Sequence, residues 1–388
     1  MHLNPIKTMK TKPLLAATGL LLTLNLQLTT AFAQGSLTPP GAPAPTMKTL
    51  AQIEPRTPIS AAPFSISAPG SYYLTTNLSV SSGDAITIAT SGVMLDLGGF
   101  TISSTATSAA GYGILINSGL QNLTIANGFI QGGVTNNGSG VYSGSGFGYG
   151  IAFSGYPSPV NVLVSRVSVS GCQNYGINLA VGDSTVVESC TARTVGGNGI
   201  VASTIKQSSA MDCGSHAIVG GQVSDCQGQS TGSGLGVNAT TALNCYGSTG
   251  SGVGVNATTA QNCYGYSTGI GFGVNATTAQ NCYGQSSSGD GLDASTAQNC
   301  EGVSNGSGYG LFISSTATGC YGSSYTGTGL YAFNANNCSG QTSSTSPSQF
   351  GLYAYDIAIG CYGSSGVGGV GIRGHILSSC DGTTTLVQ

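Results

Sequence analysis

The sequence has 388 residues, of which only 5% are charged (9 Lys and Arg, 12 Asp and Glu), and its formal net charge is −3. An ordinary globular domain has about 25% charged residues and about 7% glycine, whereas this chain contains 63 glycines. The composition therefore argues against helices with charged faces and against nucleic-acid binding, which needs a basic patch. It also argues against a disordered chain, because 40% of the residues are hydrophobic.

The N-terminus is typical of a secretory signal. A lysine-containing segment ending at Lys12 precedes an apolar stretch from Leu14 to Leu28, and a small-x-small cleavage pattern ends at Ala33. An N-terminal membrane anchor is the alternative, but the apolar stretch is short and interrupted by polar residues. We predict a signal peptide over 1–33, cleavage near Ala33, and a chain that is secreted or reaches the cell surface or periplasm with no later transmembrane segment.

Residues 34–63 hold seven of the 13 prolines and are predicted to form a Pro-rich linker. The second half of this segment, from Met47 to Pro63, is open to another interpretation, as a short N-terminal cap on the first coil of the fold. From residue 64 to residue 130 the sequence alternates apolar and polar residues between Gly, Asn and Ser breaks, as in YYLTTNLSV and VMLDLGGFTI. These runs predict short strands that form the first, wider coils.

Further along the chain, a near-exact repeat appears. GVNATTALNCYG begins at Gly236, GVNATTAQNCYG begins at Gly254 and Gly273, and GLDASTAQNCEG begins at Gly291, so the starts are 18, 19 and 18 residues apart. The cysteines follow the same period, apart from a spacing of 13 residues between the third and fourth, and we interpret all of them as one structural column: Cys172, Cys190, Cys213, Cys226, Cys245, Cys263, Cys282, Cys300, Cys320, Cys338, Cys361 and Cys380.

This period predicts the fold. Helical repeats need longer periods, and Gly, Thr, Ser and Asn oppose helix formation. Eighteen or 19 residues suffice for one circuit of short strands and turns that stacks on the next as parallel strands. We therefore predict an all-β, single-stranded right-handed parallel β-helix over 64–388, with coils of about 18–23 residues. Within a coil, Val255, Ala257, Ala260 and Cys263 should point inward, and the Asn before each Cys should take a left-handed bend.

Three phrases resemble the N-terminal region of secreted bacterial right-handed parallel β-helix repeat proteins with the pectin-lyase-like fold: EPRTPIS at 54–60, PGSYYLTTNLSV at 69–80 and GVMLDLGGFTISS at 92–104. The resemblance covers most of the chain after residue 33 and implies fold and export. It implies no activity, since this architecture hosts lyases, glycosidases and adhesins. The Arg-x-Lys and Gly-His-Gly patterns of galacturonan hydrolases are absent from the sequence.

The cysteine column allows three interpretations. Buried free thiols can act as small hydrophobic groups, adjacent coils can be joined by disulfides in an oxidising compartment, or the column can bind a soft metal. Parallel stacking leaves neighbouring Cβ atoms too far apart for an undistorted disulfide, which favours free thiols.

Tyrosines follow several of the cysteines and should point outward, because neighbouring residues of a strand face opposite sides. One hypothesis is a glycan-binding strip, and the other is an exterior ladder of rings that stack on each other. The candidate glycan-binding residues are Tyr246, Tyr264, Tyr283, Tyr321 and Tyr362.

Few acidic residues have a neighbour of their own kind. Asp212 and Asp225 each precede a Cys, so they could stack on adjacent coils as a weak cation site, although two solvated bend residues are the simpler interpretation. Asp290 and Asp293 are interpreted as turn residues. No cofactor and no definite metal site are predicted.

The scarcity of paired acids favours an exported, non-catalytic β-solenoid with a structural, cell-surface or glycan-binding role. The alternative is a polysaccharide lyase or glycoside hydrolase that acts on an acidic polysaccharide, with its site in the irregular coils between Gly111 and Arg193. The expected partner is a polysaccharide or cell-surface glycan, and the C-terminal coil could self-associate through its open edge.

Overall fold

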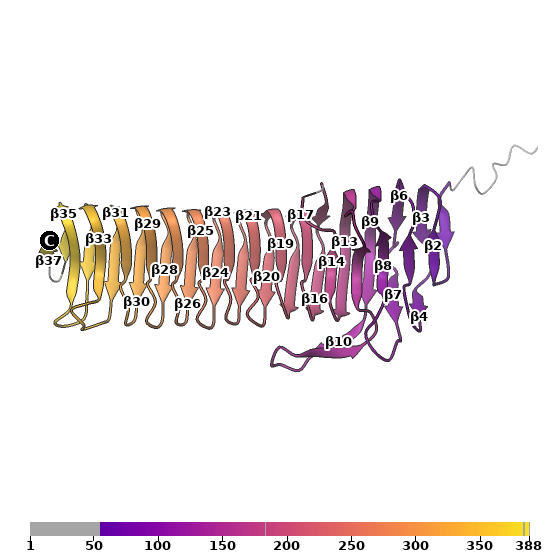
Figure 1. Ribbon diagram of the computed structural model, residues 1–388, viewed down its shortest axis with the longest axis horizontal. Coiled ribbons are helices and arrows are strands. Elements are labelled where there is room, and N and C mark those ends of the chain that lie inside the picture. Colours follow the sequence, from indigo (N-terminus) through magenta and orange to yellow (C-terminus); the bar gives the residue numbers. More distant parts are fainter. Residues whose placement is uncertain (1–54, 183, 383–384, 388) are drawn as a thin grey trace, which may run out of the picture. The chain divides into compact units, whose positions relative to one another are not determined.

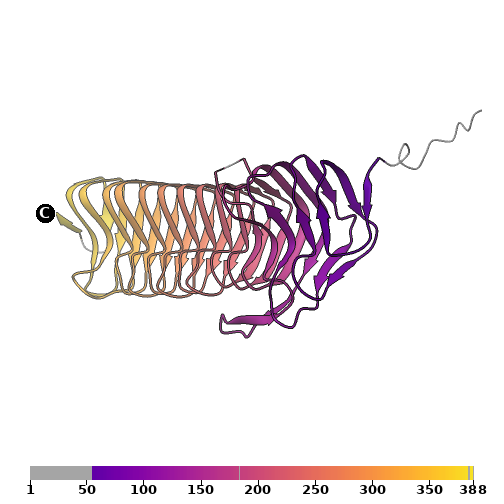
Figure 2. The same ribbon diagram turned by 45° about the vertical axis from the view of Figure 1, so that its right-hand side comes forward.

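The computed structural model describes residues 55–182, 184–382 and 385–387, and the compact unit Glu54–Gln388 contains all of them. The predicted signal peptide and most of the predicted linker lie outside the described residues. Within them there is no helix, and thus none that could cross a membrane. The unit is a right-handed parallel β-helix, as the sequence predicts (Figures 1 and 2).

The early coils have three strand faces. The first face contains β2 (Phe64–Ile66), β5 (Ile86–Ile88), β8 (Tyr112–Asn117), β12 (Tyr149–Ser154) and β14 (Tyr175–Asn178). The second contains β1 (Thr57–Ile59), β3 (Gly70–Leu74), β6 (Val93–Asp96), β15 (Val186–Glu188) and the first halves of β9 (Gln121–Gln131) and β13 (Val160–Cys172). The third contains the second halves of β9 and β13 together with β4 (Leu78–Val80), β7 (Thr101–Ser104) and β16 (Thr191–Val195).

The later coils are regular, because one strand per coil covers both the first and the second face. These strands are β17 (Ile200–Lys206), β19 (Ile218–Ser224), β21 (Val237–Leu243), β23 (Val255–Gln261), β25 (Val274–Gln280), β27 (Leu292–Gln298), β29 (Leu311–Thr318), β31 (Leu330–Asn336), β33 (Phe350–Ile359) and β35 (Val370–Ser378), and β37 (Thr385–Val387) pairs with β35. The third face continues through β18 (Ser209–Cys213), β20 (Gln227–Ser230), β22 (Tyr246–Thr249), β24 (Tyr264–Ser267), β26 (Tyr283–Ser286), β28 (Glu301–Ser304), β30 (Tyr321–Ser324), β32 (Ser339–Thr342), β34 (Tyr362–Ser364) and β36 (Asp381–Gly382).

The start of the β-helix lies within the segment whose role the sequence left open. β1 is part of this segment and pairs in parallel with β3, with Thr57 opposite Tyr72. Next to β1, the Arg56 guanidinium lies 4.6 Å from the centre of the Tyr73 ring and 3.5 Å from the Asp96 carboxylate. The residues just before Pro63 therefore contribute a strand to the first rung of the ladder.

The inward positions are those predicted. Val255 and Ala260 are 0% exposed, and Ala257 and Cys263 are 7% and 2% exposed. The register repeats this arrangement in each coil, because Val237, Val255 and Val274 pair with one another across β21, β23 and β25. Small side chains fill the interior here, so a coil of 18 or 19 residues can close around it.

The bends also follow the prediction. The Asn before each Cys has a left-handed backbone, with φ of 53° at Asn244 and 52° at Asn262 and Asn281. The glycines that begin each repeat differ, because Gly236 has no positive φ; a Cβ at this position would lie 2.5 Å from the Ser248 amide nitrogen and 2.6 Å from the Gly254 carbonyl oxygen. Glycine is required at Gly236 because coils approach closely there.

The cysteines occupy two columns, not one. Cys172 pairs with Val195, Val195 with Cys213, and Cys213 with Ser230 at the end of the third face. The other ten cysteines follow the left-handed bend, on a different corner, where Ser208 takes the place of a cysteine between Cys190 and Cys226. The spacing of 13 residues arises because Cys213 and Cys226 lie on different corners of the same coil. All twelve are free thiols, and all but Cys380 are buried.

The column that begins with Cys172 and Cys213 continues as buried hydroxyl residues, which we call the hydroxyl column: Ser230, Thr249, Ser267, Ser286, Ser304, Ser324 and Thr342. The Ser286 hydroxyl donates to the Gly271 carbonyl at 2.6 Å and accepts the Gly289 amide hydrogen with an N···O distance of 2.9 Å. Ser304 donates to the Gly289 carbonyl at 2.8 Å. Each of these hydroxyls thus holds the loop of the coil before it.

One element leaves the solenoid. β10 (Gly133–Asn136) and β11 (Tyr142–Ser145) form an antiparallel hairpin, which projects beside the coils in Figure 1. It lies within the region that the sequence predicted to protrude.

Candidate functional site

The predicted tyrosine strip is mostly a stack of rings. Tyr246 and Tyr264 have ring centres 5.2 Å apart and an interplanar angle of 21°, and Tyr264 and Tyr283 are 4.8 Å apart at 20°. Stacking occupies both faces of the Tyr264 ring, so a sugar cannot stack on it. Tyr321 lies between Glu301 and Ser339 in the register, and Ser339 separates it from Tyr362. The five tyrosines therefore do not form a continuous surface.

The Asn bends beside this stack hydrogen-bond mainly to one another. Asn262 donates to Asn244 at 3.1 Å, and Asn281 donates to Asn262 at 3.2 Å, so the amides form a chain along the axis. The groove of about 530 Å³ between these amides and the tyrosines ends at Glu301. Because its polar groups satisfy each other, this groove is mainly part of the structural framework.

The two weak metal candidates do not come together. Asp225 occupies a left-handed bend and accepts a hydrogen bond from Asn244 at 3.0 Å. Asp212 lies on the other corner, where it accepts hydrogen bonds from Asn136 at 2.6 Å and Tyr142 at 2.7 Å. The proposed stacking on adjacent coils is wrong, because the two cysteines that follow these residues belong to different columns. Within the described residues, no group of three His, Cys, Asp or Glu side chains could hold a metal ion.

The environment of Asp212 keeps it ionised. Burial alone would raise the pKa of this carboxyl, but the hydrogen bonds from Asn136, Tyr142 and Thr194 outweigh burial and lower it. A carboxylate that accepts three side-chain hydrogen bonds is an anchor for its donors, and two of these donors belong to the hairpin.

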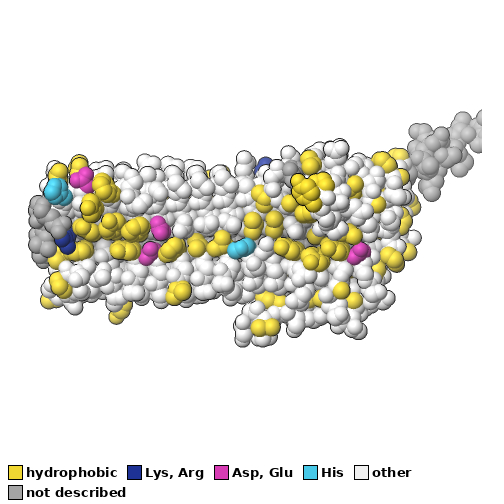
Figure 3. Space-filling model, in the orientation of Figure 1, with side chains coloured by type: hydrophobic (Ala, Val, Ile, Leu, Met, Phe, Trp, Pro, Cys, Tyr) yellow, Lys and Arg dark blue, Asp and Glu magenta, His cyan; other side chains and the backbone are white. Residues whose placement is uncertain are grey.

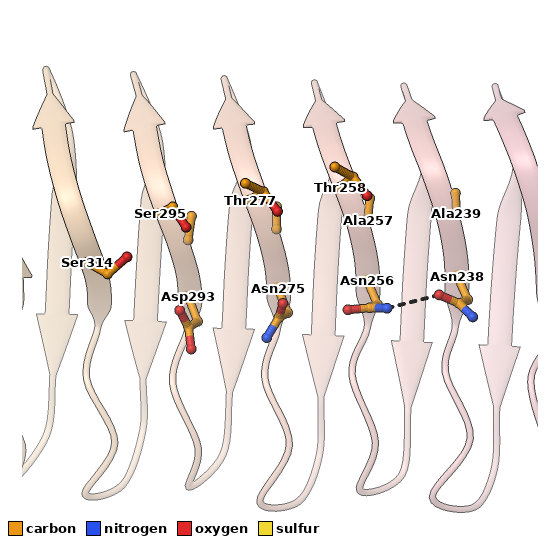
Figure 4. A pocket seen from close by; sticks show the side chains of 12 residues that line it. Asn238, Ala239, Asn256, Ala257, Thr258, Asn275, Thr277, Asp293, Ser295 and Ser314 are labelled. Carbon is orange, nitrogen blue, oxygen red and sulfur yellow. Dashed lines mark hydrogen bonds between the residues drawn. The ribbon is translucent and has the colours of Figure 1, made fainter.

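A different groove, of about 500 Å³, crosses β21, β23, β25 and β27 on the first face, and we call it the amide groove (Figure 4). In Figure 4 the near strands run upward while the chain advances from right to left, as right-handed winding requires. One wall is formed by residues that pair in register from coil to coil: Asn238, Asn256, Asn275 and Asp293. Alanines beside them leave the groove open, and the opposite wall carries hydroxyls: Thr258, Thr277, Ser295 and Ser314.

The polar groups of this groove are partly free to bind a ligand. Asn256 donates to Asn238 at 2.9 Å, whereas the Asn275 side chain forms no hydrogen bond within the described part of the chain. All four wall residues are partly exposed. The lining contains no Lys or Arg, and its one charged residue is Asp293.

The same column continues beyond the groove as aromatic side chains. Asp293 pairs with Phe312, Phe312 with Tyr331 and Tyr331 with Tyr353, and we call these three aromatic residues the aromatic extension. The rings of Phe312 and Tyr331 stack with centres 4.9 Å apart and an interplanar angle of 9°. The column then reaches Arg373, whose guanidinium lies 5.4 Å from the centre of the Tyr353 ring. Figure 3 shows a band of hydrophobic side chains with few charged groups along this side.

Two carboxyl groups lie where the amide groove meets the aromatic extension. Burial raises the pKa of Asp290, and the charge of Asp293 raises it further, while the Tyr309 amide donates to Asp290 at 2.7 Å. Burial also raises the pKa of Asp293. The sequence placed an alternative catalytic site between Gly111 and Arg193, where Glu188 is the one carboxylate in the described residues.

The sequence contains a signal for this groove, although none of its wall residues was predicted as a binding residue. The residue two positions after the repeated Gly is Asn238, Asn256, Asn275 and Asp293 in successive coils, and then Phe312, Tyr331 and Tyr353. In a strand that begins with an inward Val or Leu, this residue points outward. Alignment of the repeats would therefore have found the row.

No protein-family profile matches this chain, and no curated protein matches it. Among solved structures, the chain is distantly similar to the A-modules of two mannuronan C-5 epimerases of Azotobacter vinelandii, AlgE4 and AlgE6. Each shares 13% identity and covers 82% of this chain and 91% of the module, with TM-scores of 0.31 and 0.34. The ladder pairings place the chain in the class of parallel β-helix proteins.

Proposed function

We propose that this protein is exported and binds a linear, uncharged polysaccharide along the amide groove. The observation that carries the proposal is the repetition of one amide per coil, at Asn238, Asn256 and Asn275, in strands spaced about 4.8 Å apart. A polysaccharide presents its hydroxyl groups at regular intervals along one direction. A row of amides, which can both donate and accept hydrogen bonds, is complementary to such a ligand.

The aromatic extension supports the same ligand. Aromatic side chains next to hydrogen-bonding groups are a common feature of ligand sites, and sugar rings have apolar faces that pack on them. Phe312 follows Asp293 directly in the column. A chain lying in the groove would therefore extend onto apolar rings without changing direction.

Charge favours an uncharged polymer over the acidic one of the alternative hypothesis. The groove contains Asp293 and has no Lys or Arg in its lining. Each uronic acid unit placed against Asp293 would add like-charge repulsion. Export, with cleavage near Ala33, is part of the proposal and can be checked by the mass of the protein recovered outside the cell.

The test compares two double variants built on the same strands. Asn256→Ala with Asn275→Ala removes two amides, and loss of two hydrogen bonds of about 1 kcal/mol each weakens binding by about tenfold or more. Thr259→Ala with Thr278→Ala changes the second face of β23 and β25 and should bind like the wild type. Affinity electrophoresis in a soluble uncharged β-glucan, with alginate as the acidic comparison, measures both. Equal retention of the two variants, or preference for alginate, would refute the proposal.

Asp290 and Asp293 favour a second candidate function, glycoside hydrolysis. Two carboxyl groups close together, with pKa values raised by burial, are the kind of pair that supplies an acid and a base or nucleophile. The same glucan should then lose chain length over time, and Asp293→Asn should stop the release of reducing ends while binding persists. If no reducing ends appear with the wild type, the groove only binds.

A further inference from the structure

The hairpin of β10 and β11 is held at its base by a single buried tyrosine. Tyr142 is 8% exposed, and its hydroxyl donates to Asp212 at 2.7 Å and shares a hydrogen bond with Thr231 at 2.8 Å. Asn136, on the facing strand of the hairpin, donates to Asp212 at 2.6 Å. Gln173 of the solenoid donates to the Tyr142 carbonyl at 3.0 Å. The hairpin is therefore fixed against the third face.

A pocket of about 370 Å³ lies between the tip of this hairpin and the third face. Gly138 lines it from the hairpin, while β20, β22, β24 and the loops that follow them supply the rest of the lining. A Cβ placed on Gly138 would have no atom within 4 Å, so this side of the pocket has room for a ligand. Its volume lies in the range of small-molecule sites, about 300–1,000 Å³.

The chemistry of the lining points to one class of ligand. The pocket contains no charged side chain, and two tyrosines, Tyr246 and Tyr266, provide its aromatic surface. The hydroxyls of both tyrosines and the amide of Gln229 form no hydrogen bond within the described residues. The Ser230 hydroxyl is buried and also has no partner there. Unpaired hydroxyl and amide groups beside aromatic rings suit an uncharged polyhydroxyl compound.

We propose that this pocket binds a short neutral saccharide, separately from the amide groove. The groove lies on the first face, whereas this pocket lies on the third, and no residue lines both. Tyr266 provides the ring for the apolar side of the sugar, while Gln229 and Tyr246 are placed to bond its hydroxyls. The hairpin limits the length of the ligand, so the site takes a mono- to trisaccharide or the end of a chain.

Two tyrosines of the same strand give a matched pair of variants. Tyr266→Ala removes the ring that lines the pocket, and Tyr264→Ala removes a ring of the stacked ladder that does not. Titration calorimetry with a panel of neutral mono-, di- and trisaccharides should find a ligand for the wild type. Tyr266→Ala should weaken its binding by about tenfold or more, and Tyr264→Ala should leave it unchanged.

The hairpin itself is tested by Tyr142→Phe, which removes both anchoring hydrogen bonds but keeps the ring. This variant should lose affinity for the short saccharide while its far-ultraviolet circular dichroism stays that of the wild type. Asn256→Ala with Asn275→Ala should bind the short saccharide normally, which separates this site from the polysaccharide groove. The proposal is overturned if no saccharide of the panel binds, or if Tyr266→Ala binds as well as Tyr264→Ala.

Discussion

The coils before residue 200 and those after it solve the same packing problem in different ways. The earlier interior is filled by large side chains such as Ile86, Leu95 and Ile125, all 0% exposed, and its coils differ in length. The later interior is filled by Ala, Val, Cys and buried hydroxyls, and its coils keep nearly one length. Bulky cores accommodate insertions such as the hairpin, whereas a narrow core requires every coil to be the same.

The largest expected effects come from reversing side-chain size in the two regions. Leu95→Ala in β6 should leave a cavity and cost about 2–5 kcal/mol. Ala260→Leu in β23 has no space to occupy and should cost about 1–3 kcal/mol through overpacking. Guanidinium unfolding, followed by circular dichroism, measures both against the exposed control Thr259→Ala. A stability of Ala260→Leu equal to that of the control would show that the later bore has room for a larger side chain.

An intermediate effect is expected on the surface, where the two regions behave alike. Tyr149 stacks between Tyr112 and Tyr175, with ring centres 4.5 and 5.9 Å away, just as Tyr264 stacks between Tyr246 and Tyr283. Tyr149→Ala and Tyr264→Ala should each lose about 0.5–1.5 kcal/mol of ring stacking. Thermal melts of the two variants should therefore shift by similar amounts. A large difference between them would mean that one ladder also supports its core.

The smallest effect is chemical and leaves stability unchanged. Burial raises the pKa of Cys172 to about 12 and that of Cys190 to about 11, so both thiols stay protonated at pH 8 and react slowly. Cys380, which is only partly buried, should react first in the native protein. A thiol reagent should count twelve groups in denaturant without reductant. A count near zero would establish disulfides instead.

The sequence predicted the fold well because the repeat is itself the structure. A Gly where coils touch, an Asn at a left-handed bend and an inward Val recur once per coil, so their spacing reports the circuit directly. The two cysteine columns could not be separated in this way, because Cys213 and Cys226 differ only in the corner that each occupies. Only the pairing of Cys213 with Val195 and Ser230 reveals it.

The candidate sites were harder to predict, for two physical reasons. The amide groove needs the register that places Asp293 beside Phe312, although the repeats contain it in principle. The hairpin pocket depends on Tyr142 meeting Asp212, 70 residues away in sequence. No local pattern encodes a contact of that kind. The tyrosines attracted attention because they are aromatic and exposed, yet most of them contact each other.

The hydroxyl column makes the solenoid extensible. Ser286 and Ser304 each tie one loop to the coil before it, and neither reaches further along the axis. A coil could thus be duplicated or lost without disturbing any contact beyond its immediate neighbours. Each added coil would bring another position in the row of Asn238, Asn256 and Asn275. The reach of that surface is then set by copy number, and duplication of a segment of DNA would change it in whole steps.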